Sequence, residues 1–418
     1  MRIKLRYLTF VLIVCSPLVF AQTTYIPDDN FEQFLIDAGY DDVLDDYVVT
    51  ANINIVTELI IGNRNISDLT GIEDFTALTD LMCSQNQLFT LDVSQNINLN
   101  WLSCNNNLID GTLDLSQNTA LIQFACTNNS IDTVVLPPTA TLVNIDFGNN
   151  ELTSIDTSQN PSLTIIRADN NLLDGTLDLS QNTVLNRIDC QYNSIDQLIL
   201  PQTDILTDLD CRGNQLTALN VDYNVSLIRL LMSGNEIASI NLALHADLER
   251  LFAQFNMLTT LDLSNNVVLK YLTAHNNNLN YLSIKNGNNS NFTIEPYFVN
   301  NPLLTCIEVD DAIFSTNNWT TYVDPQHYFS EDCSLGTDES NLEAVRIFPN
   351  PLTDNLFLSF KTAKSTNYQL INVKGQIQLE GEFNELNETI DLSEISAGVY
   401  FLKLQTLHSS TIKKLVKQ

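Results

Sequence analysis

Apolar residues recur along most of the chain at a spacing of 21 or 22 residues. The repeated frame is L-x-x-L-x-(L/C)-x-x-N-x-(L/I), and LTDLMCSQNQL from Leu78 and LTDLDCRGNQL from Leu206 are two clear copies. Self-similarity at this period is typical of a solenoid whose stacked turns bury one another's apolar side chains. The first position of the frame falls, in chain order, at Val56, Leu78, Leu99, Leu121, Leu142, Leu163, Leu185, Leu206, Leu227, Leu248 and Leu269.

Positions four and six of the frame lie two residues apart, so on an extended strand their side chains point to the same side. The frame therefore predicts one short strand per turn, with these side chains inside and the strands stacked as a parallel sheet. Position nine is Asn in every copy after the first, and a buried amide there can satisfy the bending backbone. The expected structural ladder consists of Asn86, Asn107, Asn129, Asn150, Asn171, Asn193, Asn214, Asn235, Asn256 and Asn277.

Most of the eight cysteines follow the repeat. Five occupy position six, where a thiol behaves as a small apolar side chain, and no turn offers the several ligands that a metal site needs; they are Cys83, Cys104, Cys126, Cys190 and Cys211. Cys15 lies in the N-terminal segment, which leaves Cys306 and Cys333. In an exported protein this last pair is a disulfide candidate.

A second pattern lies between the strands, in hexapeptides such as LDLSQN at Leu113 and Leu177. About ten residues must return the chain to the next strand, which predicts short strands, turns or 3₁₀ turns on a convex face. An acid recurs there, and it either binds calcium or caps local turns together with the following Ser, the reading we favour. Its positions are Asp92, Asp114, Asp156, Asp178 and Asp262. No other cofactor is expected.

Residues 1–21 are predicted to be a signal peptide, because three basic residues precede an apolar run that ends before Ala21. The alternative of a membrane anchor is disfavoured by the short run and by Pro17 within it. No second long apolar stretch follows, so we expect no transmembrane segment in the mature chain. The formal charge of -31 argues against nucleic acid as a partner, because binding phosphates requires Lys and Arg.

The repeats, the leader TYIPDDNFEQFLIDAGYDD and the later segment LLTCIEVDDAIFSTNNW resemble secreted leucine-rich-repeat proteins common in the Bacteroidota. The leader has helical spacing through Phe31, Phe34 and Leu35, which predicts a helical N-terminal cap at 22–55 before the repeats at 56–305. The resemblance implies a C-terminal cap at 306–334 that contains the two remaining cysteines. Caps are needed because an open solenoid end exposes apolar side chains and an unpaired strand.

A polar linker is predicted at 335–344, followed by alternating strand-like runs at 345–418 that suit a small all-β sandwich. The motif FPNP (Phe348, Pro349, Asn350, Pro351), the run AGVYFLKL with Gly398 and Tyr400, and the basic ending KKLVK resemble the type A sorting domain of the type IX secretion system. The resemblance implies the secretion machinery as a partner and a secreted or outer-membrane-surface location. The alternative is an ordinary immunoglobulin-like accessory domain.

We expect binding rather than catalysis, because the chain has no H-E-x-x-H, no G-x-S-x-G and no phosphate-binding glycine loop. Positions three, five and seven point outward onto the concave face of the sheet, and most cations of the repeats lie on or beside that face. The expected ligand is an extracellular protein or glycan, with contacts from Arg187, Tyr192, Arg212, Arg229, Arg250, Phe252, Phe255 and Tyr271.

Three alternatives stay open at this point. The arginines could instead pair across strands with Asp189, Asp208 and Asp210 and only neutralise the sheet. The array could serve as a structural spacer or a calcium-stabilised adhesin scaffold without a discrete ligand site. An extracellular hydrolase is the weakest alternative.

Overall fold

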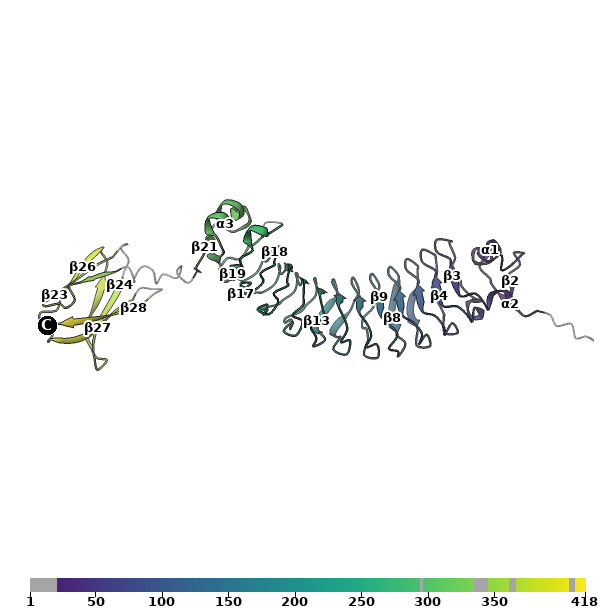
Figure 1. Cartoon of the computed structure of the whole chain (residues 1–418), viewed down its shortest axis with the longest axis horizontal. Helices are drawn as coiled ribbons and strands as arrows, with labels where there is room; N and C mark the ends of the chain where they lie inside the picture. Colours follow the sequence, from purple (N-terminus) through teal and green to yellow (C-terminus); the bar gives the residue numbers. More distant parts are fainter. Residues whose placement is uncertain (1–20, 294–295, 334–344, 361–365, 406–409) are drawn as a thin grey trace, which may run out of the picture. The chain divides into compact units, whose positions relative to one another are not determined.

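The computed structural model describes residues 21–293, 296–333, 345–360, 366–405 and 410–418. The predicted signal peptide, apart from Ala21, and the predicted linker at 335–344 lie outside the described residues. The chain divides into two compact units, with the first ending at Glu236 and the second beginning at Ile237. Figure 1 labels their elements, and each unit is described by itself.

The first unit begins with a small helical element. Strands β1 (Thr23–Tyr25) and β2 (Tyr47–Val49) pair antiparallel around helix α1 (Asp29–Asp37), and helix α2 (Thr50–Ile53) follows. The carboxylate of Asp28 caps α1 by accepting from the N–H groups of Asn30 and Phe31. Its second oxygen accepts from the N–H and hydroxyl of Ser67. The cap residue therefore fixes the helix to the first repeat.

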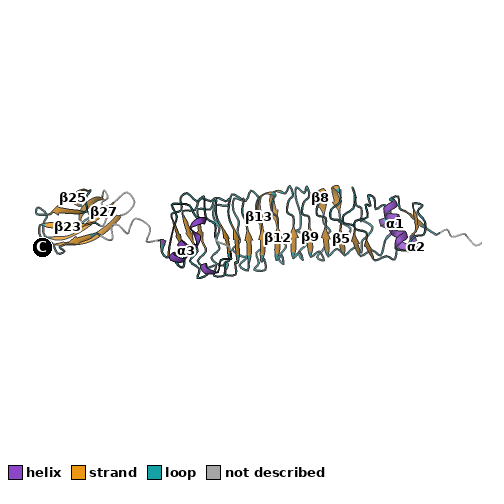
Figure 2. Cartoon of the chain, turned by 90° about the horizontal axis from the view of Figure 1, so that it is seen from above, coloured by secondary structure: helices purple, strands orange, loops and turns teal. Residues whose placement is uncertain are grey.

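The parallel sheet of the first unit contains one three-residue strand from each turn (Figure 2). Each strand pairs with the next so that equal repeat positions face each other, as Arg187 faces Asp208. The middle residue of every strand is buried, as position four of the frame predicts. The strands are β3 (Glu58–Ile60), β4 (Asp80–Met82), β5 (Trp101–Ser103), β7 (Gln123–Ala125), β9 (Asn144–Asp146), β10 (Ile165–Arg167), β12 (Arg187–Asp189), β14 (Asp208–Asp210) and β15 (Arg229–Leu231).

The return segments of the first unit are turns, short strands and a single 3₁₀ turn, as the short spacing predicts. Two pairs of parallel strands form here, β6 (Asp110–Asp114) with β8 (Ser130–Val135) and β11 (Asp174–Asp178) with β13 (Ser194–Ile199). The 3₁₀ turn η1 spans Ile72–Asp74.

In the second unit, β16 (Arg250–Phe252) pairs with β18 (Tyr271–Thr273), and Thr273 forms an isolated parallel bridge with Tyr297. A second parallel sheet follows the order β17 (Thr260–Asp262), β19 (Tyr281–Ser283), β20 (Cys306–Glu308) and β21 (Tyr328–Ser330). The 3₁₀ turn η2 (Asn289–Asn291) lies between β19 and β20 in the chain, and η3 (Thr320–Tyr322) lies between β20 and β21.

Helix α3 (Ala312–Trp319) closes the end of the repeats. Its Trp319 is 2% exposed and packs edge-on against Phe329 of β21, with ring centroids 5.9 Å apart. The predicted disulfide between Cys306 and Cys333 is confirmed, and it links β20 to the end of this segment. The five repeat thiols are free and buried, and burial raises the pKa of Cys83 to about 12, so these groups are poor nucleophiles.

The position-nine asparagines lie at the corner that follows each strand. Asn214 shows the pattern: its amide donates to the carbonyls of Cys190 and Cys211, and its oxygen accepts from the N–H of Ile195. One amide thus joins two successive turns. The ladder also extends to Asn301, whose amide donates to the carbonyls of Ala274 and Phe298.

A second ladder lies on the return segments, at the final Asn of the SQN-type hexapeptides. Asn118 is fully buried, and its amide donates to the carbonyls of Val93 and Asn96. The hexapeptides themselves carried the signal for this ladder, which sequence reasoning missed because it used only their Leu and Asp positions. The members with the same pair of contacts are Asn96, Asn118, Asn160, Asn182, Asn224 and Asn266.

The described residues between 345 and 418 form an all-β region, as predicted, with two antiparallel sheets. One sheet has the order β22 (Arg346–Phe348), β23 (Asn355–Ser359) and β26 (Asn387–Asp391). The other has the order β25 (Ile377–Phe383), β24 (Thr366–Asn372), β27 (Gly398–Gln405) and β28 (Ser410–Lys417). Leu356, Leu370 and Leu402, from strands of both sheets, belong to one buried apolar cluster.

Candidate binding face

We define the sheet face as the outward surface of the parallel strands, formed by positions three, five and seven of the frame. Of the eight predicted ligand contacts, Arg187, Tyr192, Arg212 and Arg229 lie in the first unit. Arg250, Phe252, Phe255 and Tyr271 lie in the second. Each unit therefore contains four of the predicted contacts.

In the first unit, the arginines of the sheet face are largely paired with carboxylates. The Arg212 guanidinium lies 2.6 Å from Asp210, and that of Arg229 lies 2.7 Å from Asp208. Arg167 lies 3.6 Å from Asp146 in the same manner. These contacts match the alternative in which cations neutralise neighbouring acids, so the first unit offers less free positive charge than its composition suggested.

Asp189 is the most perturbed carboxyl of this face. It is 9% exposed, and burial together with the negative charges of Asp210 and Asp169 raises its pKa to about 6. The same effect of burial raises the pKa of Asp146. The fold thus disfavours the charged forms of Asp189 and Asp146, and ionising these two carboxyls costs stability.

In the second unit, Arg250 is held by aromatic rings. Its guanidinium lies 4.3 Å from the ring centroid of Tyr271 and 5.9 Å from that of Phe252. Within the described residues, Arg250 has no ion pair and no side-chain hydrogen bond. Lys270, the neighbouring cation, is instead paired with Glu249 at 2.8 Å. Arg250 therefore combines a planar cation with free donors on a partly exposed surface.

The residue before the ladder Asn, position eight, has a left-handed backbone in every one of the eleven turns. Asn or Gly occupies most of these positions, as expected, because they tolerate positive φ at little cost. Tyr192 (φ 54°) and Phe255 (φ 55°) are the aromatic exceptions, and their side chains are 55% and 56% exposed. The run of Asn and Gly at position eight was the sequence signal for this conformation.

The recurring acids of the return segments cap turns. Asp92, Asp114 and Asp156 each accept from the N–H of the Ser two residues later, at 2.8–2.9 Å. This bond lowers the pKa of Asp114 and Asp156. In the described part of the chain, no cluster of three or more His, Cys, Asp or Glu is arranged to hold a metal ion.

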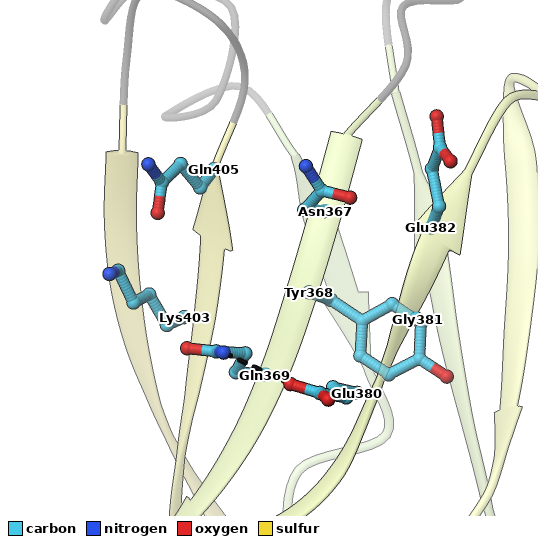
Figure 3. A pocket seen from close by; sticks show the side chains of 8 residues that line it. All are labelled: Asn367, Tyr368, Gln369, Glu380, Gly381, Glu382, Lys403 and Gln405. Atoms are coloured by element: carbon cyan, nitrogen blue, oxygen red, sulfur yellow. Dashed lines mark hydrogen bonds between the residues drawn. The ribbon is translucent and has the colours of Figure 1, made fainter.

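A separate hollow of about 440 Å³ lies in the C-terminal domain, across β25, β24 and β27 (Figure 3). The Tyr368 ring lies over Gly381, where an added Cβ would meet it at 2.6 Å, and Gln369 donates to Glu380. Sequence reasoning gave no signal for this hollow. Its lining residues are Asn367, Tyr368, Gln369, Glu380, Gly381, Glu382, Lys403 and Gln405.

The sorting-motif residues take structural positions in the same domain. The amide of Asn350 donates to the carbonyl of Lys414, and its oxygen accepts from the N–H of Val416, which attaches the FPNP segment to β28. Both X–Pro bonds of that motif, before Pro349 and Pro351, are cis. Phe348 stacks on Phe357, and the Tyr400 hydroxyl donates to the carbonyl of Ser396. Gly398 begins β27.

Comparison with known proteins assigns the C-terminal domain. Residues 346–418 match the family described as "Secretion system C-terminal sorting domain". Among curated proteins, internalin J of Listeria monocytogenes is 39% identical over 72 residues, which are 17% of this chain and 8% of that protein. An endo-acting ulvan lyase of Formosa agariphila is 34% identical over 89 residues, 20% of this chain and 17% of that protein. The chain thus aligns with a small part of each relative.

A solved structure shows the fold of the repeats. The functional domain of InlJ from Listeria monocytogenes, which includes a cysteine ladder, superposes with a TM-score of 0.50. The match covers 95% of this chain and 99% of that chain at 22% identity. No helix of the described residues has the length and apolar character needed to cross a membrane. The repeats thus have the leucine-rich-repeat fold, and residues 346–418 belong to the C-terminal sorting domains of the type IX secretion system, which direct export to the cell surface or the extracellular space.

Proposed function

We propose that the repeat array is a recognition module without catalytic activity, which binds an extracellular protein or glycan through its sheet face. The observation that carries the proposal is Arg250, a cation stacked on Tyr271 with no carboxylate partner in the described residues. Arg and Tyr are enriched in the residues that dominate binding energy at interfaces. Export by the sorting domain places such a surface where external ligands are available.

The second unit supports the proposal more strongly than the first. Phe252 lies on the strand of Arg250, and Tyr271 is the cross-strand partner of Arg250 in the parallel ladder. In the first unit, Arg212 and Arg229 are neutralised by aspartates, which leaves Arg187 and Tyr192 as its more available contacts. We therefore centre the proposed ligand site on Arg250, Phe252 and Tyr271.

The test is charge reversal in the mature chain, residues 22–418. Arg250→Glu is expected to weaken binding to hits from an array of glycans and extracellular proteins by about tenfold or more, because it removes the guanidinium donors and their stacking on the Tyr271 ring. Lys270→Glu changes the charge equally, but Lys270 is already paired with Glu249, so we expect less than about a twofold effect. Equal affinities for wild type and Arg250→Glu would contradict the assignment.

A further inference from the structure

The aromatic residue at position eight of the second unit begins a row of rings. Phe255 contacts His275 edge-on with centroids 5.2 Å apart, and His275 contacts Tyr297 at 4.5 Å. The three residues come from three successive turns, since Phe255 follows β16, His275 follows β18 and Tyr297 bridges to Thr273. The row therefore runs from turn to turn across the strands.

The left-handed backbone conformation at Phe255 is one that Asn or Gly adopts more readily than Phe. At φ 55°, a bulky side chain is strained, whereas the equivalent positions of the next two turns carry Asn276 and Asn300. Backbone strain of this kind persists where the strained residue has a functional role, and strained residues cluster at binding sites. Phe255 is not an interior packing residue, because 56% of it is exposed to solvent.

The side chains of Asn276 and Asn300 beside the rings are uncharged, and the carboxylate of Asp324 accepts from the backbone N–H groups of Asn300 and Asn301. The amide of Asn300 donates to the oxygen of Asn276 at 3.0 Å, which leaves the Asn276 amide and the Asn300 oxygen with no side-chain partner in the described residues. Burial lowers the pKa of His275, which favours the neutral form of its ring. The row thus offers the rings of Phe255 and Tyr297 on either side of the His275 imidazole, bordered by one free amide donor and one free carbonyl acceptor.

We propose that Phe255, His275 and Tyr297 form a stacking platform for an uncharged polysaccharide, with Asn276 and Asn300 bonding to its hydroxyls. The proposal rests on the recognition function proposed above and names its ligand class. A pyranose ring has an apolar C–H face and a hydroxyl rim, which match rings and amides respectively. A row across successive turns suits a polymer of repeated units. A polyanion is disfavoured by 50 acidic against 19 basic residues in the chain.

The test replaces Phe255 by the residue that the backbone prefers. For the mature chain with Phe255→Asn, we expect the melting temperature to rise by about 2 °C or more as strain is relieved. Calorimetric titration with soluble β-glucan, xylan and mannan should show wild-type binding to at least one, weakened about tenfold or more in the variant. Gln85→Asn, a non-aromatic position-eight residue at φ 59°, should raise the melting temperature and leave binding unchanged.

Unchanged polysaccharide affinity in Phe255→Asn overturns the proposal, and so does a fall in its melting temperature, which would make Phe255 a packing residue. Failure of all three polysaccharides to bind wild type also overturns it. In that case, the recognition function would still be supported by any array ligand whose binding is weakened by Arg250→Glu. The proposed recognition function itself would be contradicted if the array ligands bound wild type and Arg250→Glu with equal affinity.

Discussion

Asn214→Ala is expected to lower the free energy of unfolding of the first unit by about 3 kcal/mol. The substitution removes an amide that donates to the carbonyls of Cys190 and Cys211, and it leaves the N–H of Ile195 without this acceptor. Each buried polar group that loses its partner costs about 1–3 kcal/mol, and solvent cannot reach the corner because Asn214 is 9% exposed. Urea unfolding followed by circular dichroism measures the change.

Asn186→Ala is the matched control for this prediction. Asn186 is exposed, and its side chain makes no hydrogen bond within the part of the chain that the structure describes. We expect a change within about 0.5 kcal/mol, as for most surface substitutions. Similar losses in the two variants would show that the ladder amides do not carry the stability assigned to them.

Asp189→Asn is expected to stabilise the protein at pH 8 by about 2 kcal/mol and to have little effect near pH 4. Burial and the charges of Asp210 and Asp169 raise the pKa of Asp189 to about 6 in the folded state, against an ordinary value of 3.8. A raised folded-state pKa contributes stability below pH 4, and that contribution is lost as the pH rises through 6. The neutral amide avoids this loss while it can still accept from the N–H of Gln191.

The measurement is the difference in unfolding free energy between variant and wild type at several pH values from 4 to 8. Asp156→Asn is the control, because the hydrogen bond from the Ser158 N–H lowers the pKa of that carboxyl, so no gain at pH 8 is expected. A difference for Asp189→Asn that stays constant over this range would rule out titration of Asp189 as its cause.

The repeat period predicted the fold, because every turn places the same residue types at the same inward and corner positions. Inward positions four and six, the corner amides such as Asn86, and the Cys306–Cys333 disulfide are all found in the structure. The second amide ladder and the left-handed position eight also repeat in the sequence. The second ladder was missed because the hexapeptides were interpreted only through their Leu and Asp positions. The left-handed position eight was missed because Asn and Gly there also suit ordinary turns.

Side-chain partners could not be predicted in the same way. Frame positions place Arg229 and Arg250 in equivalent sites, yet Arg229 bonds to Asp208 while Arg250 stacks on Tyr271. The difference depends on which residue the neighbouring strand presents at the paired position, Asp208 in one case and Tyr271 in the other. Which arginines are free to bind a ligand thus depends on the residue paired with each of them on the neighbouring strand, and the repeat period does not specify that residue.

Hydroxyl-radical footprinting of the mature chain, with and without an array-identified ligand, tests the recognition surface most directly. The account predicts slower oxidation of Phe252 and Tyr271 when ligand is present, because both rings border the free Arg250 guanidinium. Tyr223, in an exposed turn, and Phe401, in the C-terminal domain, should oxidise at unchanged rates. Protection confined to Phe401 and its domain, with Phe252 and Tyr271 unaffected, would contradict recognition by the sheet face.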